Sequence, residues 1–459
     1  MPNIHSSPAF HELDELDELF DLFGDQDNED IRLLRQRKMK CWEYKRIRWH
    51  SHVCKLLHQS EFERTYGMRL PTFNKLVTVL LPDVKRNVRK SRVTEPVFPE
   101  LIVAVGLRYL RGGMVSDLKD VYGTSRSGIY HCRKTFLTAL LVNDRLRIKM
   151  PSTVEQWNEV RLSFIDKSSM GLMRGCVGAL DGFLQGFQAP TKKDAKGNVD
   201  AFHSGHYNCH GLNCQGLCDV YLRFMFFGVV APGRTHDSMA IHLAEGLLDV
   251  INNLPDGMYV VADAAYVLSE HLLIPFTGCM ADNPDRDAYN FYLSQLRIRI
   301  EMAFGRMVRK FGILRRTLET NVRNTTSILL ACATLHNFII DEDVISFLSD
   351  NTEDTTSASN DESDEDEIER NPMQIENRRS VRVPAGMNVP QGMEYRPTMP
   401  EGVELEQVEG FSNLRMQIID EIKTNMIRRP HYNIQRNQRR RERESRTFQG
   451  VNEEYFSPR

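Results

Sequence analysis

Three acidic residues occur in a pattern that could bind divalent metal ions. Asp181 and Asp263 each end an apolar run typical of a buried strand, and Glu301 lies in a run with the period of an amphipathic helix. Cleavage of a phosphodiester by two metal ions requires carboxylates that bridge the ions, and Mg²⁺ and Mn²⁺ prefer such oxygen ligands. We therefore interpret Asp181, Asp263 and Glu301 as the catalytic, metal-binding residues of a nuclease that uses two Mg²⁺ or Mn²⁺ ions.

The predicted helix that contains Glu301 spans residues 293–316 and is strongly basic outside its apolar stripe. Arg297 lies one turn before Glu301, so one interpretation is an ordinary surface ion pair, which contributes roughly a few tenths of a kcal/mol. In the other interpretation, Arg297 orients the carboxylate or neutralises a phosphate of bound DNA. The helix alone does not separate the two, but the strand acids upstream favour the second.

Asp237 is a fourth candidate metal ligand. It lies in the sequence Thr235-His236-Asp237-Ser238, which precedes a predicted helix over residues 237–252. An acid in the first turn of a helix is also favoured by the helix dipole. Metal binding and helix capping therefore remain equal alternatives for Asp237.

A group of thiols and imidazoles within 16 residues raises the question of a zinc site. Zinc-finger sites separate two ligand pairs by a longer loop, whereas this group lies partly in a predicted strand, where alternate side chains face opposite ways. We expect no structural zinc there. The group comprises His203, His206, Cys209, His210, Cys214 and Cys218.

Residues 96–141 predict a unit of three helices. The first covers 99–110, the short second covers 116–122, and after a Gly-Thr-Ser turn the third covers 126–141 with Ser125 as its N-cap. This is the pattern of a helix-turn-helix, whose last helix enters the major groove of DNA, although three-helix bundles without DNA also need such turns. The side chains that the last helix would present to DNA are Arg126, Ser127, Tyr130, His131, Arg133 and Lys134.

Strands alternate with helices from residue 175 onward, which predicts an α/β sheet. A hairpin is expected from strands over 212–219 and 222–230, and further strands over 258–263 and 272–276. A helix over 325–341 would close this core.

The net charge of −3 conceals blocks of opposite sign. Residues 1–30 hold ten acids and no Lys or Arg, 31–50 hold eight basic residues and one acid, half of 350–369 is acidic, and 428–446 holds eight Arg. Such blocks are typical of a chain that handles a polyanion, and the Arg-rich tail is typical of a nuclear-localisation or nucleic-acid-binding segment. Nine unevenly spaced Cys indicate reduced thiols inside the cell, and the lack of a long apolar run predicts no membrane span.

These patterns divide the chain into four predicted regions. They are an acidic disordered arm (1–30), a helical region with the helix-turn-helix (31–150), a catalytic domain (165–345), and a disordered acidic linker with an Arg-rich tail and one possible isolated helix (346–459, helix over 408–426).

Five short motifs, in this order and spacing, resemble those of the PIF/Harbinger transposases and their domesticated relatives, a family of DDE superfamily endonucleases. The similarity covers roughly residues 95–345. The motifs are Ala179-Leu180-Asp181-Gly182, the segment from Ser204-Gly205-His206-Tyr207 to Gln215-Gly216-Leu217-Cys218-Asp219, Pro232-Gly233-Arg234-Thr235-His236-Asp237-Ser238, Ala262-Asp263-Ala264-Ala265-Tyr266, and Arg299-Ile300-Glu301-Met302-Ala303-Phe304-Gly305.

By this resemblance the catalytic triad falls on Asp181, Asp263 and Glu301, and Asp237 falls on a position that the family often uses as a further metal ligand. The chain has Phe183-Leu184 where relatives commonly carry Thr-His, a departure in the substrate-side contacts of that loop rather than in the metal site.

The resemblance implies an RNase H-like catalytic domain preceded by an all-α helix-turn-helix domain. It implies metal-dependent cleavage and joining of transposon-end DNA, often with a separate Myb-like partner protein, while the Arg-rich tail indicates the nucleus; a homo-oligomer is left open. The alternative is a domesticated protein that keeps the fold and binds DNA or chromatin without cleaving it. The presence of every acid favours activity, and an RNA nuclease is disfavoured because the family acts on DNA.

Overall fold

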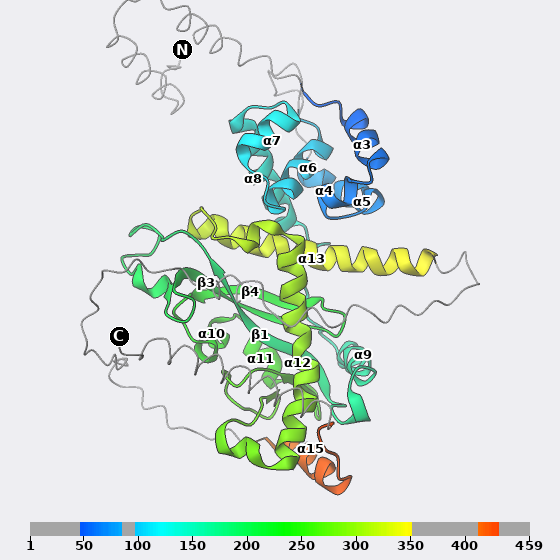
Figure 1. The fold of residues 1–459 in the computed structure, drawn as a ribbon, viewed down its shortest axis with the longest axis vertical. Helices are drawn as coiled ribbons and strands as arrows, with labels where there is room; N and C mark the ends of the chain where they lie inside the picture. Colours follow the sequence, from blue (N-terminus) through cyan, green and yellow to red (C-terminus); the bar gives the residue numbers. More distant parts are fainter. Residues whose placement is uncertain (1–45, 85–96, 351–411, 431–459) are drawn as a thin grey trace, which may run out of the picture.

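The computed structural model describes residues 46–84, 97–350 and 412–430. A bundle of helices and an α/β part are packed together, with the long helix α13 (Val322–Asp350) lying between them (Figure 1). The predictions for the acidic arm at 1–30, the acidic segment at 351–369 and the Arg-rich sequence after residue 430 lie outside the described residues. None of the described helices combines the length and apolar character needed to cross a membrane.

The helical bundle follows local sequence signals closely. Its helices are α3 (Trp49–His58), α4 (Phe62–Tyr66), α5 (Leu70–Val84), α6 (Pro99–Leu110), α7 (Val115–Tyr122) and α8 (Arg126–Val142). Gly123 ends α7 with a left-handed φ of 58°, and the Ser125 hydroxyl accepts a hydrogen bond from the N–H of Gly128 at 3.1 Å, which caps α8. The three predicted helices and the predicted N-cap are therefore present.

The α/β part is built on a mixed sheet of six strands. These are β1 (Cys176–Gly186), β2 (His203–Ser204), β3 (Cys209–Cys218), β4 (Phe224–Pro232), β5 (Tyr259–Val261) and β6 (Leu272–Leu273). The order is β2-β3-β1-β5-β6, and β4 also pairs with β3. Strands β1, β5 and β6 are parallel, whereas the predicted β3–β4 hairpin and the β1–β3 pair are antiparallel.

Helices cover both faces of the sheet because alternate residues of its strands are apolar on each side. Ala179 and Phe183 of β1 belong to the core under α12 (Pro284–Lys310) and α13. Leu180 belongs to a second core with α9 (Val154–Ile165), α10 (Asp237–Leu243) and α11 (Leu247–Asn252). Short 3₁₀ turns occur at Ser169–Gly171, Asp200–Phe202, Gly278–Asp282 and Gly312–Arg315.

The single helix predicted over 237–252 is wrong, because the chain breaks it into α10 and α11. Gly246 has a φ of 73°, a left-handed conformation that a helix interior does not contain and that glycine adopts readily.

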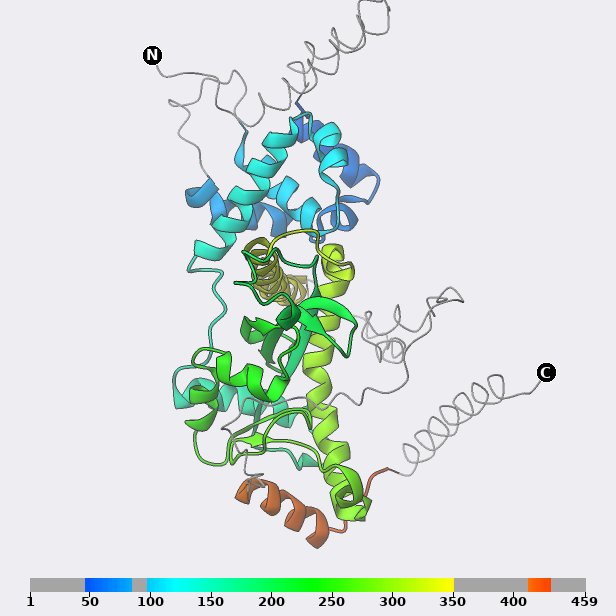
Figure 2. The same cartoon turned by 90° about the vertical axis from the view of Figure 1, so that its left-hand side faces the viewer.

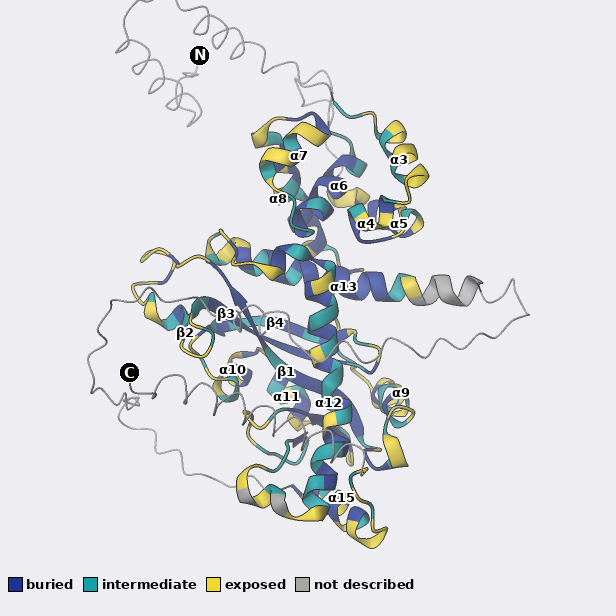
Figure 3. Cartoon of the chain, in the orientation of Figure 1, coloured by how far each residue is buried: buried dark blue, intermediate teal, exposed yellow. Residues whose placement is uncertain are grey.

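The bundle and the α/β part share one apolar core. Buried residues run continuously from α5, α6 and α8 through α13 to α12 (Figure 3). Arg111, just after α6, donates a hydrogen bond from Nη1 to the backbone oxygen of Lys310 at 2.7 Å. The helical bundle therefore contacts the C-terminal end of α12 directly.

The predicted C-terminal helix is present as α15 (Asn413–Thr424), but it is not isolated. Ile418, Ile419 and Ile422 are buried on one face of α15 and join the main core. Figure 2 shows α15 in orange-red beside the first turns of α12. The helix is stable there because burial removes its apolar face from water.

Candidate active site

Asp181 lies in the middle of β1 and faces α12. It pairs with Gly216 of β3, and directly opposed residues of antiparallel strands point to the same face. A Cβ atom on Gly216 would lie 2.8 Å from the ring of Phe304 in α12, so this face is the one that α12 covers. The expectation that the strand ends at Asp181 is wrong, because β1 continues to Gly186 by pairing with β3.

Asp263 follows the neighbouring parallel strand. Ala179 of β1 pairs with Val261, the last residue of β5, so two further residues along each chain lead to Asp181 and Asp263. The Asp263 carboxylate accepts a hydrogen bond from the N–H of Ala264 at 2.7 Å. The strands that lead to Asp181 and Asp263 are therefore neighbours in the sheet, and the helix that carries Glu301 packs on β1.

Arg297 joins the carboxylates of the strand and the helix. Its Nη1 atom lies 3.7 Å from Oδ2 of Asp181 and forms an ion pair with Glu301, one turn further along α12. Asp181 and Arg297 are 21% and 22% exposed, whereas Glu301 is 46% exposed. The pair with Glu301 is thus not a simple surface pair, because the same guanidinium also reaches a mostly buried acid.

The electrostatics of Asp181 show that the three acids act on one another. Burial raises the pKa of Asp181 to about 7, and the negative charges of Asp263 and Glu301 contribute to the rise. Arg297 and the N–H of Gly182 oppose it by stabilising the charged form. A cation placed among these groups would lower the pKa of Asp181 again, because it stabilises the carboxylate.

Asp237 lies on the opposite face of the sheet from Glu301. It is the first residue of α10, and its Oδ1 atom accepts hydrogen bonds from Asn213 at 2.9 Å and Gln215 at 3.0 Å. A Cβ atom on Gly182 would lie 2.3 Å from the same oxygen. Since Gly182 and Asp181 point to opposite faces, Asp237 approaches β1 from behind the triad.

A buried polar network surrounds Asp237. The Tyr266 hydroxyl donates to Oε1 of Gln215 at 2.6 Å, and the Gln215 amide nitrogen also donates to Asn213 at 2.9 Å. Burial raises the pKa of Tyr266 well above its usual value, and Asp237 and Asp181 add to this. Gln215 and Tyr266 lie in the family motifs, but no role was predicted for them or for Asn213, although two amides at alternate positions of an apolar strand were a usable signal.

Within the described residues, no three His, Cys, Asp or Glu side chains converge into a ready-made metal-binding group. At the triad, Arg297 supplies the positive charge between Asp181 and Glu301. In the group of thiols and imidazoles, His203 of β2 and His210 of β3 are paired residues with ring centroids 5.3 Å apart. Cys214 and Cys218 are buried, and burial raises the pKa of each thiol.

The candidate DNA-binding residues of α8 share one exposed face. Arg126, Ser127, Tyr130 and Lys134 are exposed. Arg133 is partly buried, because its guanidinium lies over the rings of Tyr109 at 4.6 Å and Tyr130 at 4.9 Å. The exposed face is thus available to a partner, while Arg133 contributes to its shape.

The family of the α/β part follows from comparison with known proteins. Residues 180–337 match the family model described as DDE superfamily endonuclease. The chain contains a DDE superfamily endonuclease domain. The matched segment of this DDE domain includes Asp181, Asp237, Asp263 and Glu301, so the predicted membership of the superfamily is confirmed.

The chain that carries the DDE domain is also homologous to "Putative nuclease HARBI1" from Xenopus laevis. The two are 23% identical over 285 residues, which cover 61% of this chain and 78% of that relative. No solved structure matches the chain.

Proposed function

We propose that the protein is a metal-dependent DNA endonuclease that cleaves and joins transposon-end DNA at Asp181, Asp263 and Glu301. The observation that supports this most strongly is the excess of acid at one point of the DDE domain. Three carboxylates influence one another there, and Arg297 pairs with two of them. Structural ion pairs usually match charges, whereas functional sites hold groups with displaced pKa values.

The donor atoms at this point fit a hard divalent cation such as Mg²⁺ or Mn²⁺. Asp181, Asp263 and Glu301 offer only carboxylate oxygens, and burial together with the charges of Asp263 and Glu301 raises the pKa of Asp181 despite the nearby Arg297. These three residues would hold two ions. When bound, the ions activate water and stabilise the charge that develops on the phosphate. Arg297 is then free to pair with a phosphate of the DNA.

The rest of the chain supports a DNA substrate. A mixed sheet covered by helices on both faces is consistent with an RNase H-like fold, and the exposed face of α8 offers Arg126, Ser127, Tyr130 and Lys134 to DNA. The Arg-rich sequence at 428–446 supports nuclear localisation. A Myb-like accessory protein and a homo-oligomer are proposed from the family resemblance alone.

The test is nicking of a plasmid that carries the inverted repeats flanking the coding region. The full chain should nick the repeats in Mg²⁺ or Mn²⁺ and stop in EDTA. Asp181→Asn and Glu301→Gln should abolish nicking, whereas Glu245→Gln, at an exposed acid of α10–α11 outside the site, should not. Metal-dependent nicking that survives Glu301→Gln in a normally melting protein would refute the assignment. DNA binding with no nicking under any metal would instead favour the domesticated, non-cleaving alternative.

A further inference from the structure

The segment between α8 and α9 presents three cations in a row. Arg145, Arg147 and Lys149 are exposed, while Leu146 between the first two is 9% exposed. Ile148 and Met150 are partly buried and pack against the two cores. The alternate apolar side chains hold the segment to the protein, so the three cations project from it. We refer to Arg145, Arg147 and Lys149 as the basic track.

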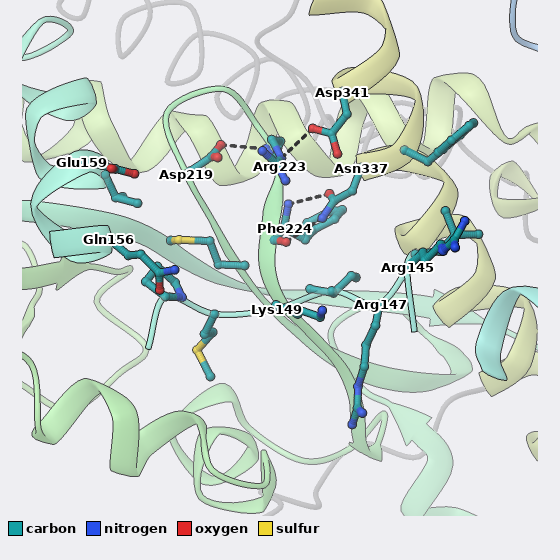
Figure 4. Close-up of a pocket in the computed structure, with 17 residues that line it drawn as sticks. Arg145, Arg147, Lys149, Gln156, Glu159, Asp219, Arg223, Phe224, Asn337 and Asp341 are labelled. Carbon is teal, nitrogen blue, oxygen red and sulfur yellow. Dashed lines mark hydrogen bonds and ion pairs between the residues drawn. The ribbon is translucent and has the colours of Figure 1, made fainter. Parts of the chain in front are cut away.

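The basic track forms one wall of a hollow of about 470 Å³ at the β4 edge of the sheet (Figure 4). The other walls come from α9, from the turn between β3 and β4, and from α13, which contribute Glu159, Asp219, Arg223 and Asp341. Figure 4 shows Arg145 and Arg147 on the side of the hollow away from Glu159 and Asp219. Arg145 and Arg147 therefore lie apart from Glu159 and Asp219, whereas Arg223 lies between Asp219 and Asp341.

Two of the three acids are already engaged. Asp219 accepts hydrogen bonds from the N–H groups of Tyr221 and Arg223, each at 2.9 Å, which closes the β3–β4 turn. Asp341 pairs with Nε of Arg223 at 3.1 Å. These contacts hold the wall of the hollow in place, and they leave Glu159 as the remaining acid.

The basic track has no such partners. Across residues 46–84, 97–350 and 412–430, no side chain forms a hydrogen bond or ion pair with the side chains of Arg145, Arg147 or Lys149. An isolated exposed cation is ordinary on a protein surface, because water solvates it. Three such cations within five residues concentrate positive charge in one segment, in which residues 144–146 form a turn. Such a concentration of cations suits the phosphates of a nucleic-acid backbone.

We propose that the basic track binds the sugar–phosphate backbone of the DNA substrate, between the part held by α8 and the part that enters the DDE domain. This inference rests on the proposed function, since it assigns a surface to the same substrate. The track directly follows α8 in the chain and precedes α9, which packs on β1. Long, flexible cations that reach phosphates fix the position of a duplex without reading its sequence. The track therefore sets where the DNA lies rather than which site is chosen.

The test is binding of a labelled duplex of arbitrary sequence to the full chain in EDTA, over a series of salt concentrations. The variant Arg145→Gln/Arg147→Gln/Lys149→Gln should lower the slope of log affinity against log salt by roughly 2–3, because about 0.9 is lost per phosphate contact. Near 0.1 M salt its binding should be weaker by about tenfold or more. The control Lys55→Gln/Lys167→Gln/Lys423→Gln removes the same charge from scattered exposed positions and should change the slope little.

A second variant separates charge from shape. Arg145→Lys/Arg147→Lys keeps the cations and should keep the salt dependence, with unchanged thermal melting. Equal slopes for the Gln variant and the scattered control would overturn the inference. Tighter DNA binding by the Gln variant would also overturn it, since it would show that an acidic segment of the chain, such as residues 1–30, occupies the track. Because no metal is present, either result stands apart from whether Asp181 and Glu301 support nicking.

Discussion

The two halves of α12 carry acids in contrasting surroundings. At its start, Asp285 forms an ion pair with Arg428, and Asp287 lies 2.9 Å from Nη1 of Arg429. In its second half, Glu301 shares Arg297 with Asp181, and Asp263 adds a third negative charge. In the first half of α12, which we call the matched half, each acid pairs with its own arginine. In the second half, three acids lie around the single arginine Arg297.

The matched half holds a distant segment of the chain in place. The Glu270 carboxylate accepts hydrogen bonds from the N–H groups of Asn413 and Leu414 at the start of α15, and Arg174 pairs with Glu421 at 3.1 Å. The guanidinium of Arg415 lies 3.3 Å from the centre of the Phe276 ring. The acids Glu270, Asp285, Asp287 and Glu421 each have a partner in this region, although within the described residues Nε of Arg415 and of Arg429 is buried without a hydrogen-bond partner. The triad lacks that balance, which is the property expected of a site that binds cations.

The largest effect should come from removing one acid of the triad. Asp181→Asn, Asp263→Asn and Glu301→Gln should each reduce nicking roughly a thousandfold, because a metal-ion ligand supports several kcal/mol of transition-state stabilisation. Asp287→Asn, in the matched half of the same helix, should leave nicking nearly unchanged. Plasmid nicking with thermal melting as a control measures this. Equal losses for Asp287→Asn and Glu301→Gln would remove the distinction between the two halves.

A core change in α15 should cost stability instead of activity. Ile422 is fully buried, so Ile422→Ala should lower the free energy of unfolding by about 3 kcal/mol, or by the whole docking energy of α15 if that is smaller. Met416→Ala, at an exposed position of the same helix, should change it little. Urea unfolding gives the free energy, and amide exchange in α15 and the first turns of α12 gives its location. An unchanged free energy of unfolding in Ile422→Ala would mean that α15 does not stabilise the α/β part.

The pKa of Asp181 predicts how stability changes with pH in EDTA. Because its folded pKa, about 7, lies above the ordinary value of 3.8, the folded chain binds a proton more tightly, and this contribution to stability is lost as pH rises toward 7. The variant Asp181→Asn does not lose stability in this way, because its side chain does not titrate. Its stability relative to the parent should therefore increase by about 3 kcal/mol between pH 5 and pH 8. Unfolding midpoints at both pH values measure this, and a constant difference would contradict the raised pKa of Asp181.

The smallest effect should separate the two roles of Asp237. Asp237→Asn keeps an oxygen that can accept from Asn213 and Gln215, so an anchoring role predicts a stability cost of about 1 kcal/mol and retained nicking. Metal binding predicts a loss of nicking as large as that of Asp181→Asn. Measuring both properties on one preparation decides between them. Loss of nicking with unchanged melting would show that Asp237 is a ligand despite its place behind the triad.

Local signals allowed much of the helical bundle to be predicted. Ser125 caps α8 and Gly123 ends α7 through interactions that span only a few residues, so the sequence contains all the information they need. The break at Gly246 was missed, because the apolar period continues across it and glycine is tolerated within many helices. The docking of α15 was also missed, since its partners on α12 lie more than a hundred residues away in the chain.

The sequence by itself identified the residues of the candidate site and the superfamily to which its domain belongs. The five motifs that contain Asp181, Asp237, Asp263 and Glu301 identified the DDE superfamily, whereas the parallel pairing of β1 with β5 is a finding of the structure. Only the tertiary structure decided which acids face one another. Pairing between β1 and β3 fixes which side chains point toward α12, and a shift of one residue would exchange the faces. That register places Asp181 with Glu301 and leaves Asp237 behind them, held by Asn213 and Gln215.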